Sequence, residues 1–244
     1  MINFVVSVNK YLINSLSVFF PTYNEEGHIR NTVLSAKKVL ENVAKNWEII
    51  IVNDGSSDRT KGIAEKLRSE DSRINLVSHG ENRGYGASLQ SGFYNAKYPW
   101  IAFTDSDGQF DFSEITKFVE TQKHTNSDLV IGFYKKRQVS KFKIATSRMW
   151  EFSVTVLFGL HVHDIDCGFK LVSKKVIDRI PKLESERGAF ISSELLIKAK
   201  KAGFKIVEIP VTHYPRTKGK GTGRDLKVIM KSFVDLFRLW RKLK

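Results

Sequence analysis

Two aspartates flank one serine at the end of a short apolar segment, where residues 100–109 read Trp-Ile-Ala-Phe-Thr-Asp-Ser-Asp-Gly-Gln. Asp105 and Asp107 can offer two carboxylates to one hard cation, and Gln109 can add a neutral oxygen. Mg²⁺ and Mn²⁺ suit such ligands. A cation there would bridge the phosphates of a nucleotide sugar and neutralise the leaving diphosphate. Because an Asp/Gly turn alone produces the same pattern, the motif needs support from its surroundings.

That support comes from two further polar turns. Residues 21–26 read Pro-Thr-Tyr-Asn-Glu-Glu, and residues 53–58 read Asn-Asp-Gly-Ser-Ser-Asp. We expect Asp54 to hold a base or ribose by hydrogen bonds and Asp58 to cap the helix that follows. The first turn fits a helix start and a nucleotide-facing surface equally well. Residues 82–86, Asn-Arg-Gly-Tyr-Gly, place a cation and two glycines where the backbone must approach something closely.

The elements that position these turns alternate between β-rich apolar runs and segments of helical period. Strands are predicted at residues 16–20, 47–52, 74–78, 100–104 and 129–132, and helices at 29–43, 60–68, 87–96 and 115–122. This order predicts an α/β domain with a mostly parallel, Rossmann-like sheet flanked by helices. Ligands of such sheets bind beyond the carboxyl ends of the strands, so the three turns are expected at one edge.

The second half of the chain is predicted to be more varied. A helical segment at residues 140–160 precedes a strand at 168–172, a helix at 192–202, a strand at 205–211 and a glycine-rich basic loop at 216–224. The last predicted helix covers residues 225–243. Its apolar residues recur every three or four positions, with lysine and arginine mainly elsewhere. This amphipathic pattern fits a membrane surface, the chain's own domain or a partner protein.

Composition narrows the function further. The 244 residues suit one catalytic domain, and the net charge is +14, of which +11 falls within residues 198–244. Such a basic end attracts phosphates of nucleic acid, anionic lipid or substrate. No apolar run approaches the roughly 20 residues of a spanning helix, and the amino terminus lacks the features of a signal peptide. The single Cys167 excludes an intrachain disulfide and is expected to be buried.

Taken in order, the motifs at residues 17–26, 52–60, 82–87 and 105–109 resemble the family 2 glycosyltransferases of the GT-A fold. Within that family the chain is similar to dolichol-phosphate mannose synthases and bacterial polyprenyl-phosphate glycosyltransferases. The resemblance implies an amino-terminal extension at 1–14, a GT-A domain at 15–224 and a basic amphipathic helix at 225–244. Residues 15–110 would form the nucleotide-sugar half and residues 111–224 the acceptor half.

The resemblance also implies roles for individual residues. Donor contacts are expected from Pro21, Tyr23, Glu25, Asn53, Asp54, Arg83 and Asp105. Metal contacts are expected from Asp105, Asp107 and Gln109. The acceptor phosphate is expected at Arg137, Lys143, Ser147 and Arg216, and the catalytic set is Asp105, Asp107, Lys143 and Arg216. Residues 132–137, Gly-Phe-Tyr-Lys-Lys-Arg, depart from the usual Ser-Arg, so Lys135 and Lys136 are alternatives to Arg137.

The chemistry of the acceptor favours a phosphate. A lipid monophosphate is largely dianionic at neutral pH and needs positioning cations more than a general base. The expected reaction is therefore inverting, metal-dependent transfer of mannose or glucose from a GDP- or UDP-sugar to polyprenyl or dolichyl phosphate. The alternative acceptor is a glycan hydroxyl, with Glu194 or Asp166 as the base.

Two readings outside this activity are weaker. A nucleic-acid-binding module is disfavoured because no reader motif is present and acidic turns would repel a phosphate backbone. A binding scaffold without activity is disfavoured by the intact Asp105, Asp107 and Gln109. The expected location is the cytoplasmic face of a membrane, as a peripheral protein, with a membrane-spanning partner protein as a further expectation.

Overall fold

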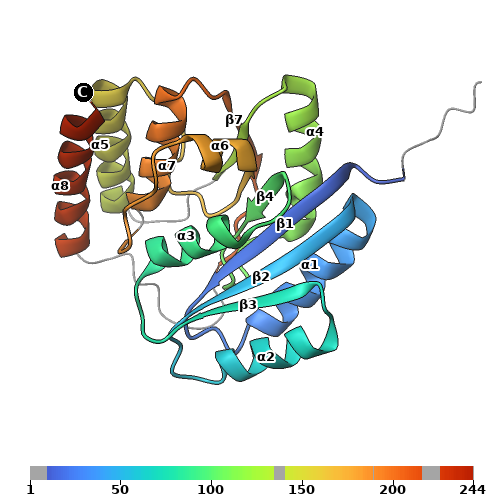
Figure 1. Ribbon diagram of the computed structural model, residues 1–244. Coiled ribbons are helices and arrows are strands. Elements are labelled where there is room, and N and C mark those ends of the chain that lie inside the picture. The colour runs from blue at the N-terminus through green and yellow to red at the C-terminus, as the bar shows by residue number, and fades with distance from the viewer. Residues whose placement is uncertain (1–9, 135–140, 189, 216–225, 244) are drawn as a thin grey trace, which may run out of the picture.

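The computed structural model describes residues 10–134, 141–188, 190–215 and 226–243 (Figure 1). Its strands are β1 (Ile13–Thr22), β2 (Ala44–Asp54), β3 (Ile74–His79), β4 (Trp100–Phe103), β5 (Leu129–Tyr134), β6 (Lys170–Ser173) and β7 (Ile206–Val211). Its helices are α1 (Ile29–Val43), α2 (Thr60–Glu70), α3 (Tyr85–Asn95), η1 (Phe112–Glu114), α4 (Ile115–Thr125), α5 (Lys141–Phe158), α6 (Lys174–Arg179), α7 (Phe190–Lys201) and α8 (Leu226–Leu243).

The strands form one seven-stranded sheet in the order β3-β2-β1-β4-β6-β5-β7. β6 runs antiparallel to its neighbours β4 and β5, and the remaining pairs are parallel. The predicted mostly parallel α/β sheet is therefore confirmed. The reversal of β6 was not predicted, because the apolar pattern of a four-residue strand carries no information about its direction.

Helices cover both faces of the sheet, and the alternation of side chains along each strand explains the two cores. On β1, Phe19 packs on the face covered by α3, α5, α6, α7 and α8, whereas Val18 and Phe20 pack on the face covered by α1, α2 and α4. Phe19 stacks on Phe103 at 5.1 Å and meets the edge of Phe93 of α3 at 5.0 Å. The sheet is thus buried on both sides, as a parallel sheet requires.

The final helix packs on its own domain. Leu236 and Leu239 of α8 are buried, and Phe233 meets the ring of Trp150 of α5 at 5.1 Å. α8 and α5 lie side by side at one end of the molecule (Figure 1). Of the three settings that the amphipathic pattern allowed, packing against the chain's own domain is therefore observed for this face of α8.

Candidate active site

The turns after β1 and β2 are hydrogen-bonded to each other. The strands pair in register up to Thr22 and Asn53, so both turns leave the sheet at the same level. Asn24 then exchanges hydrogen bonds with the second turn: its amide donates to Ser56 Oγ at 3.0 Å and its side-chain oxygen accepts from the Ser57 amide at 2.9 Å. The two turns form one surface at the carboxyl edge of the sheet.

Asp58 has the predicted role at a helix start. Its Oδ1 accepts the Thr60 amide at 2.9 Å at the beginning of α2, and its Oδ2 accepts the Glu26 amide at 3.2 Å. Burial acts to raise the pKa of Asp58, but hydrogen bonds from the Thr60 side chain and from the backbone amides of Thr60 and Glu26 lower the pKa overall. Asp58 therefore joins the first two turns through its carboxylate.

The turn after β4 closes on the same edge. Ser106 donates from Oγ to the Pro21 carbonyl at 2.8 Å, and Thr32 of α1 donates to the Ser106 carbonyl at 3.3 Å. Gly108 has a φ of +75° and lies against the His28 ring, at a distance that leaves little room for a side chain. Three turns, at residues 21–26, 53–58 and 105–109, thus meet at one edge of the sheet.

Asp54 organises a fourth turn. Its Oδ1 accepts the Arg83 amide at 2.9 Å and its Oδ2 accepts the Gly84 amide at 2.8 Å. His79, at the end of β3, also contacts Oδ1 through Nδ1 at 2.6 Å. The buried carboxylate therefore shapes residues 82–84. The sequence did not identify His79, although its position as the last residue of a strand at the carboxyl edge is a usable signal.

Residues expected to contact the donor differ in exposure. Tyr23 is 44% exposed, and Arg83 is exposed and forms an ion pair with Glu186 at 2.7 Å. The others in the described structure are buried or half-buried: Pro21, Glu25, Asn53, Asp54 and Asp105. Tyr23 and Arg83 therefore lie at the rim of the edge, whereas the others form its floor.

The aspartate pair is held by contacts on both sides. Asp107 is 7% exposed, and its Oδ1 accepts the Gln109 amide at 3.1 Å. Asp105 accepts the Tyr85 hydroxyl on Oδ1 at 2.9 Å. Gln109 donates from Nε2 to the Tyr214 carbonyl at 2.9 Å and so links this turn to the residues after β7.

The reversed strand β6 brings a further segment to the aspartates. Phe103 pairs with Lys170 in the antiparallel register, which places Asp105, two residues later, opposite Gly168, two residues earlier. A Cβ on Gly168 would lie 2.3 Å from Asp105 Oδ2. A side chain here would displace the Asp105 carboxylate, so glycine lets the backbone approach it closely. Cys167 beside it is buried as predicted, and burial raises the pKa of its thiol to about 12.

The carboxylates fit a divalent cation that shares its coordination with a ligand. Among the residues that the structure describes, no group of three or more His, Cys, Asp or Glu could hold a metal by itself. Mg²⁺ is commonly held by one or two carboxylates together with substrate phosphates and water. Asp105 and Asp107 supply two such carboxylates. Because Gly168 has no side chain, its backbone packs directly against one side of Asp105.

The predicted acceptor residues are described only in part. Arg137 and Arg216 lie outside the described residues, as do the alternatives Lys135 and Lys136. Lys143 belongs to the first turn of α5, although its side chain is outside the described part, and half-buried Ser147 lies one turn further on.

Glu194 is engaged inside the protein. Its carboxylate accepts Lys198 Nζ at 2.5 Å and the amides of Glu184 and Ser185, each at 2.9 Å, and both charged side chains are almost fully buried. It therefore fixes the segment before α7. Asp166, the other candidate base, is exposed and follows Asp164, whose Oδ1 accepts its amide at 3.2 Å.

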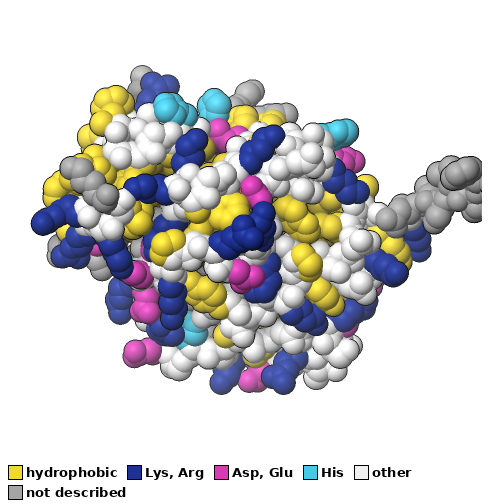
Figure 2. Space-filling model, turned by 45° about the horizontal axis from the view of Figure 1, so that its top comes forward, with side chains coloured by type: hydrophobic (Ala, Val, Ile, Leu, Met, Phe, Trp, Pro, Cys, Tyr) yellow, Lys and Arg dark blue, Asp and Glu magenta, His cyan; other side chains and the backbone are white. Residues whose placement is uncertain are grey.

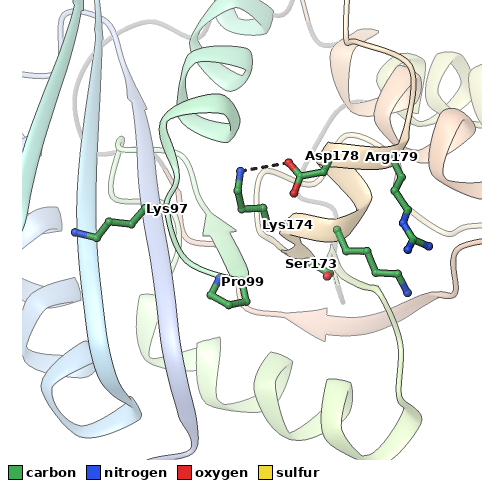
Figure 3. A pocket seen from close by; sticks show the side chains of 7 residues that line it. Lys97, Pro99, Ser173, Lys174, Asp178 and Arg179 are labelled. Atoms are coloured by element: carbon green, nitrogen blue, oxygen red, sulfur yellow. Dashed lines mark ion pairs between the residues drawn. The ribbon is translucent and has the colours of Figure 1, made fainter.

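A separate cavity of about 370 Å³ lies at the opposite edge of the sheet, where β4 begins and β6 ends (Figure 3). Lys174 forms an ion pair with Asp178 at 3.4 Å, and Lys97 forms one with Glu48 at 3.4 Å. Lys97 and Arg179 point in opposite directions in Figure 3. The basic side chains do not converge on one ligand, so the carboxyl edge remains the candidate site.

The amino-acid sequence is similar to those of known glycosyltransferases. The sequence model of glycosyl transferase family 2 matches residues 17–180. A dolichyl-phosphate beta-glucosyltransferase of Saccharomyces cerevisiae is 31% identical, with 81% of this chain and 66% of that protein aligned. A dodecaprenyl-phosphate galacturonate synthase of Rhizobium johnstonii is 29% identical over 88% of this chain and 64% of its own length. The chain thus spans slightly less than two thirds of these relatives.

The fold also matches solved structures. Glucosyl-3-phosphoglycerate synthase from Mycobacterium tuberculosis, crystallised with Mn²⁺, UDP-glucose and phosphoglyceric acid, superimposes with a TM-score of 0.72 at 17% identity. The match covers 93% of this chain and 80% of that one. At this identity the likeness establishes the shared GT-A fold.

Proposed function

Because this chain belongs to glycosyl transferase family 2, we propose that it transfers glucose or mannose from a nucleoside diphosphate to polyprenyl or dolichyl phosphate, with a divalent metal and with inversion. The observation that carries this proposal is that four turns, one of which contains Asp105 and Asp107, are linked by hydrogen bonds at the carboxyl edge. Relatives named for dolichyl- or polyprenyl-phosphate acceptors support the lipid phosphate, and two named for glucosyl transfer favour glucose.

In this mechanism the chain chiefly positions its substrates. The turns after β1, β2 and β3 would hold the nucleoside, with Tyr23 and Arg83 more exposed and Pro21, Glu25, Asn53 and Asp54 beneath them. Asp105, Asp107 and Gln109 would hold Mg²⁺ or Mn²⁺, and the cation would supply positive charge to stabilise the departing diphosphate. Arg137, Lys143, Ser147 and Arg216 hold the acceptor phosphate in line with the anomeric carbon.

A phosphate acceptor also agrees with the state of the candidate bases. An ionised phosphate attacks without losing a proton, so no general base is needed. Glu194 is occupied by Lys198 and two backbone amides, which supports a structural role for this carboxylate. A glycan hydroxyl, the alternative acceptor, would then have to rely on Asp166 as the base.

The acceptor assignment is tested by offering the full chain labelled UDP-glucose or GDP-mannose with Mn²⁺. We expect transfer to polyprenyl phosphate in detergent and none to oligosaccharides. A phosphate-linked lipid product that is labile to mild acid identifies the bond formed. Transfer to oligosaccharide alone would contradict the proposal and favour the hydroxyl-acceptor alternative.

The surface formed by α5 and α8 supports contact with a membrane. None of the described helices is long and apolar enough to span a bilayer. The exposed large aliphatic and phenylalanine side chains of the described chain nevertheless all lie on these two helices: Met149, Phe152, Val156, Val234 and Phe237. Arg148, Arg238 and Arg241 are exposed on the same helices. Figure 2 shows hydrophobic and basic side chains together at this end of the molecule. We propose that the enzyme binds the cytoplasmic face of a membrane through this surface of α5 and α8.

Vesicle flotation tests this surface. We expect the full chain to float with vesicles that contain anionic lipid and to be released by salt, because apolar insertion and charge act together. Phe152 is 68% exposed, so Phe152→Ser should weaken binding several-fold without a large loss of stability. Tyr94→Ser on α3, also exposed, is the control away from α5 and α8. Equal flotation of wild type and Phe152→Ser would contradict this surface.

A further inference from the structure

Tyr85 is the first residue of α3, and its side chain reaches the candidate metal site. Its hydroxyl donates to Asp105 Oδ1 at 2.9 Å, across 20 residues of sequence. Its ring packs against the core cluster that contains Phe93 and Phe103.

Tyr85 is placed by a chain of backbone contacts on both sides. Asp54 accepts the amides of the two preceding residues, Arg83 and Gly84. Gly84 has a φ of +105°, a conformation that favours glycine. On the other side, the Ala87 amide donates to the Glu186 carbonyl at 2.9 Å. The first turn of α3 is therefore held between the carboxyl edge of the sheet and the segment before α7.

The partner of this hydroxyl is itself tightly enclosed. Asp105 lies between Tyr85 on the Oδ1 side and the backbone of Gly168 on the Oδ2 side. A carboxylate that ligates a metal is oriented by such outer contacts, and their loss lowers metal affinity or activity by about 10- to 100-fold. Tyr85 has the geometry of such an outer contact.

We propose that Tyr85 is a positioning residue that sets the orientation of Asp105 for the divalent cation, and that Asp54 acts on the same carboxylate through the Arg83–Gly84 turn. This inference rests on the proposed function, because the role of Asp105 as a metal ligand is part of that proposal. Tyr85 itself binds neither metal nor substrate in this arrangement.

Mn²⁺ binding to the full chain, measured in the presence of UDP and separately of GDP, tests the proposal without turnover. Tyr85→Phe removes only the hydroxyl and keeps the ring in the core. We expect the dissociation constant for Mn²⁺, measured by electron paramagnetic resonance, to rise about 10- to 100-fold. In the transfer assay the metal concentration for half-maximal rate should rise in parallel, and saturating Mn²⁺ should restore most of kcat.

Tyr94→Phe is the matched control, since Tyr94 lies on the same helix and its hydroxyl accepts the Leu183 amide at 3.0 Å away from Asp105. It should leave Mn²⁺ affinity unchanged. Melting curves recorded beside the titration separate loss of fold from loss of orientation. Equal Mn²⁺ affinity in wild type and Tyr85→Phe would overturn the positioning role alone. Failure of the wild type to bind Mn²⁺ with either UDP or GDP would overturn the proposed function and this role together.

Discussion

Asp107→Asn should abolish metal-dependent transfer while leaving the fold intact. The substitution removes one negative charge from the aspartate pair but retains an oxygen able to accept the Gln109 amide, which Asp107 Oδ1 accepts at 3.1 Å. We expect kcat/KM to fall by a factor on the order of 10³, equivalent to about 4 kcal/mol of transition-state stabilisation. The loss arises because charge on the leaving diphosphate is no longer neutralised.

The measurement is transfer from labelled nucleotide sugar over a range of Mn²⁺ concentrations, together with a thermal melt. Asp111→Asn is the matched control: Asp111 accepts the Ser113 amide at 2.9 Å at the start of η1, four residues from Asp107. It removes the same charge outside the pair and should change transfer little. Turnover of Asp107→Asn within tenfold of wild type would remove the metal assignment from this residue.

Of the variants proposed for this protein, Glu194→Gln should cause the largest loss in the free energy of unfolding. Lys198, which is almost fully buried, would lose its carboxylate partner, and the amide of Gln cannot accept on both sides as the carboxylate does. Breaking a buried ion pair from one side costs about 3–5 kcal/mol. We expect the free energy of unfolding in urea to fall by about that amount.

Glu186→Gln is the control for this prediction. Its ion pair with Arg83 is about half exposed on both sides, and exposed pairs contribute roughly 0–1 kcal/mol. The comparison also separates two roles for Glu194. If it were the general base, Glu194→Gln would retain wild-type stability and lose turnover with a hydroxyl acceptor, and that outcome would contradict the structural role.

The helices and strands of residues 15–110 could be predicted closely from local patterns. The helix predicted at 29–43 is observed at Ile29–Val43, and the strands before each polar turn lie where the apolar runs indicated. These elements succeed because each carries its own signal: strand runs buried on both faces, followed by turn residues with specific backbone requirements. The role of Asp58 at a helix start could be predicted for the same reason.

Contacts between distant segments could not be predicted. Tyr85 belonged to a recognised motif, but its bond to Asp105 depends on α3 packing between two loops. Glu194 was a candidate base because an acidic residue near a helix start can act either as a general base or as a structural carboxylate. In the structure Glu194 is buried and forms an ion pair with Lys198, four residues later. Sequence spacing alone does not reveal whether such a pair lies inside the protein or on its surface.

The amino-acid sequence by itself determined the α/β class, the three polar turns at strand ends and the amphipathic final helix, because these follow from periodicity and turn chemistry within short windows. Tertiary structure alone decided that β6 is reversed and brings Gly168 onto Asp105, that Asp54 shapes a fourth turn, and that α8 packs on α5 and α7. The physical reason is that strand direction, burial of charge and helix docking depend on which distant surfaces exclude water together.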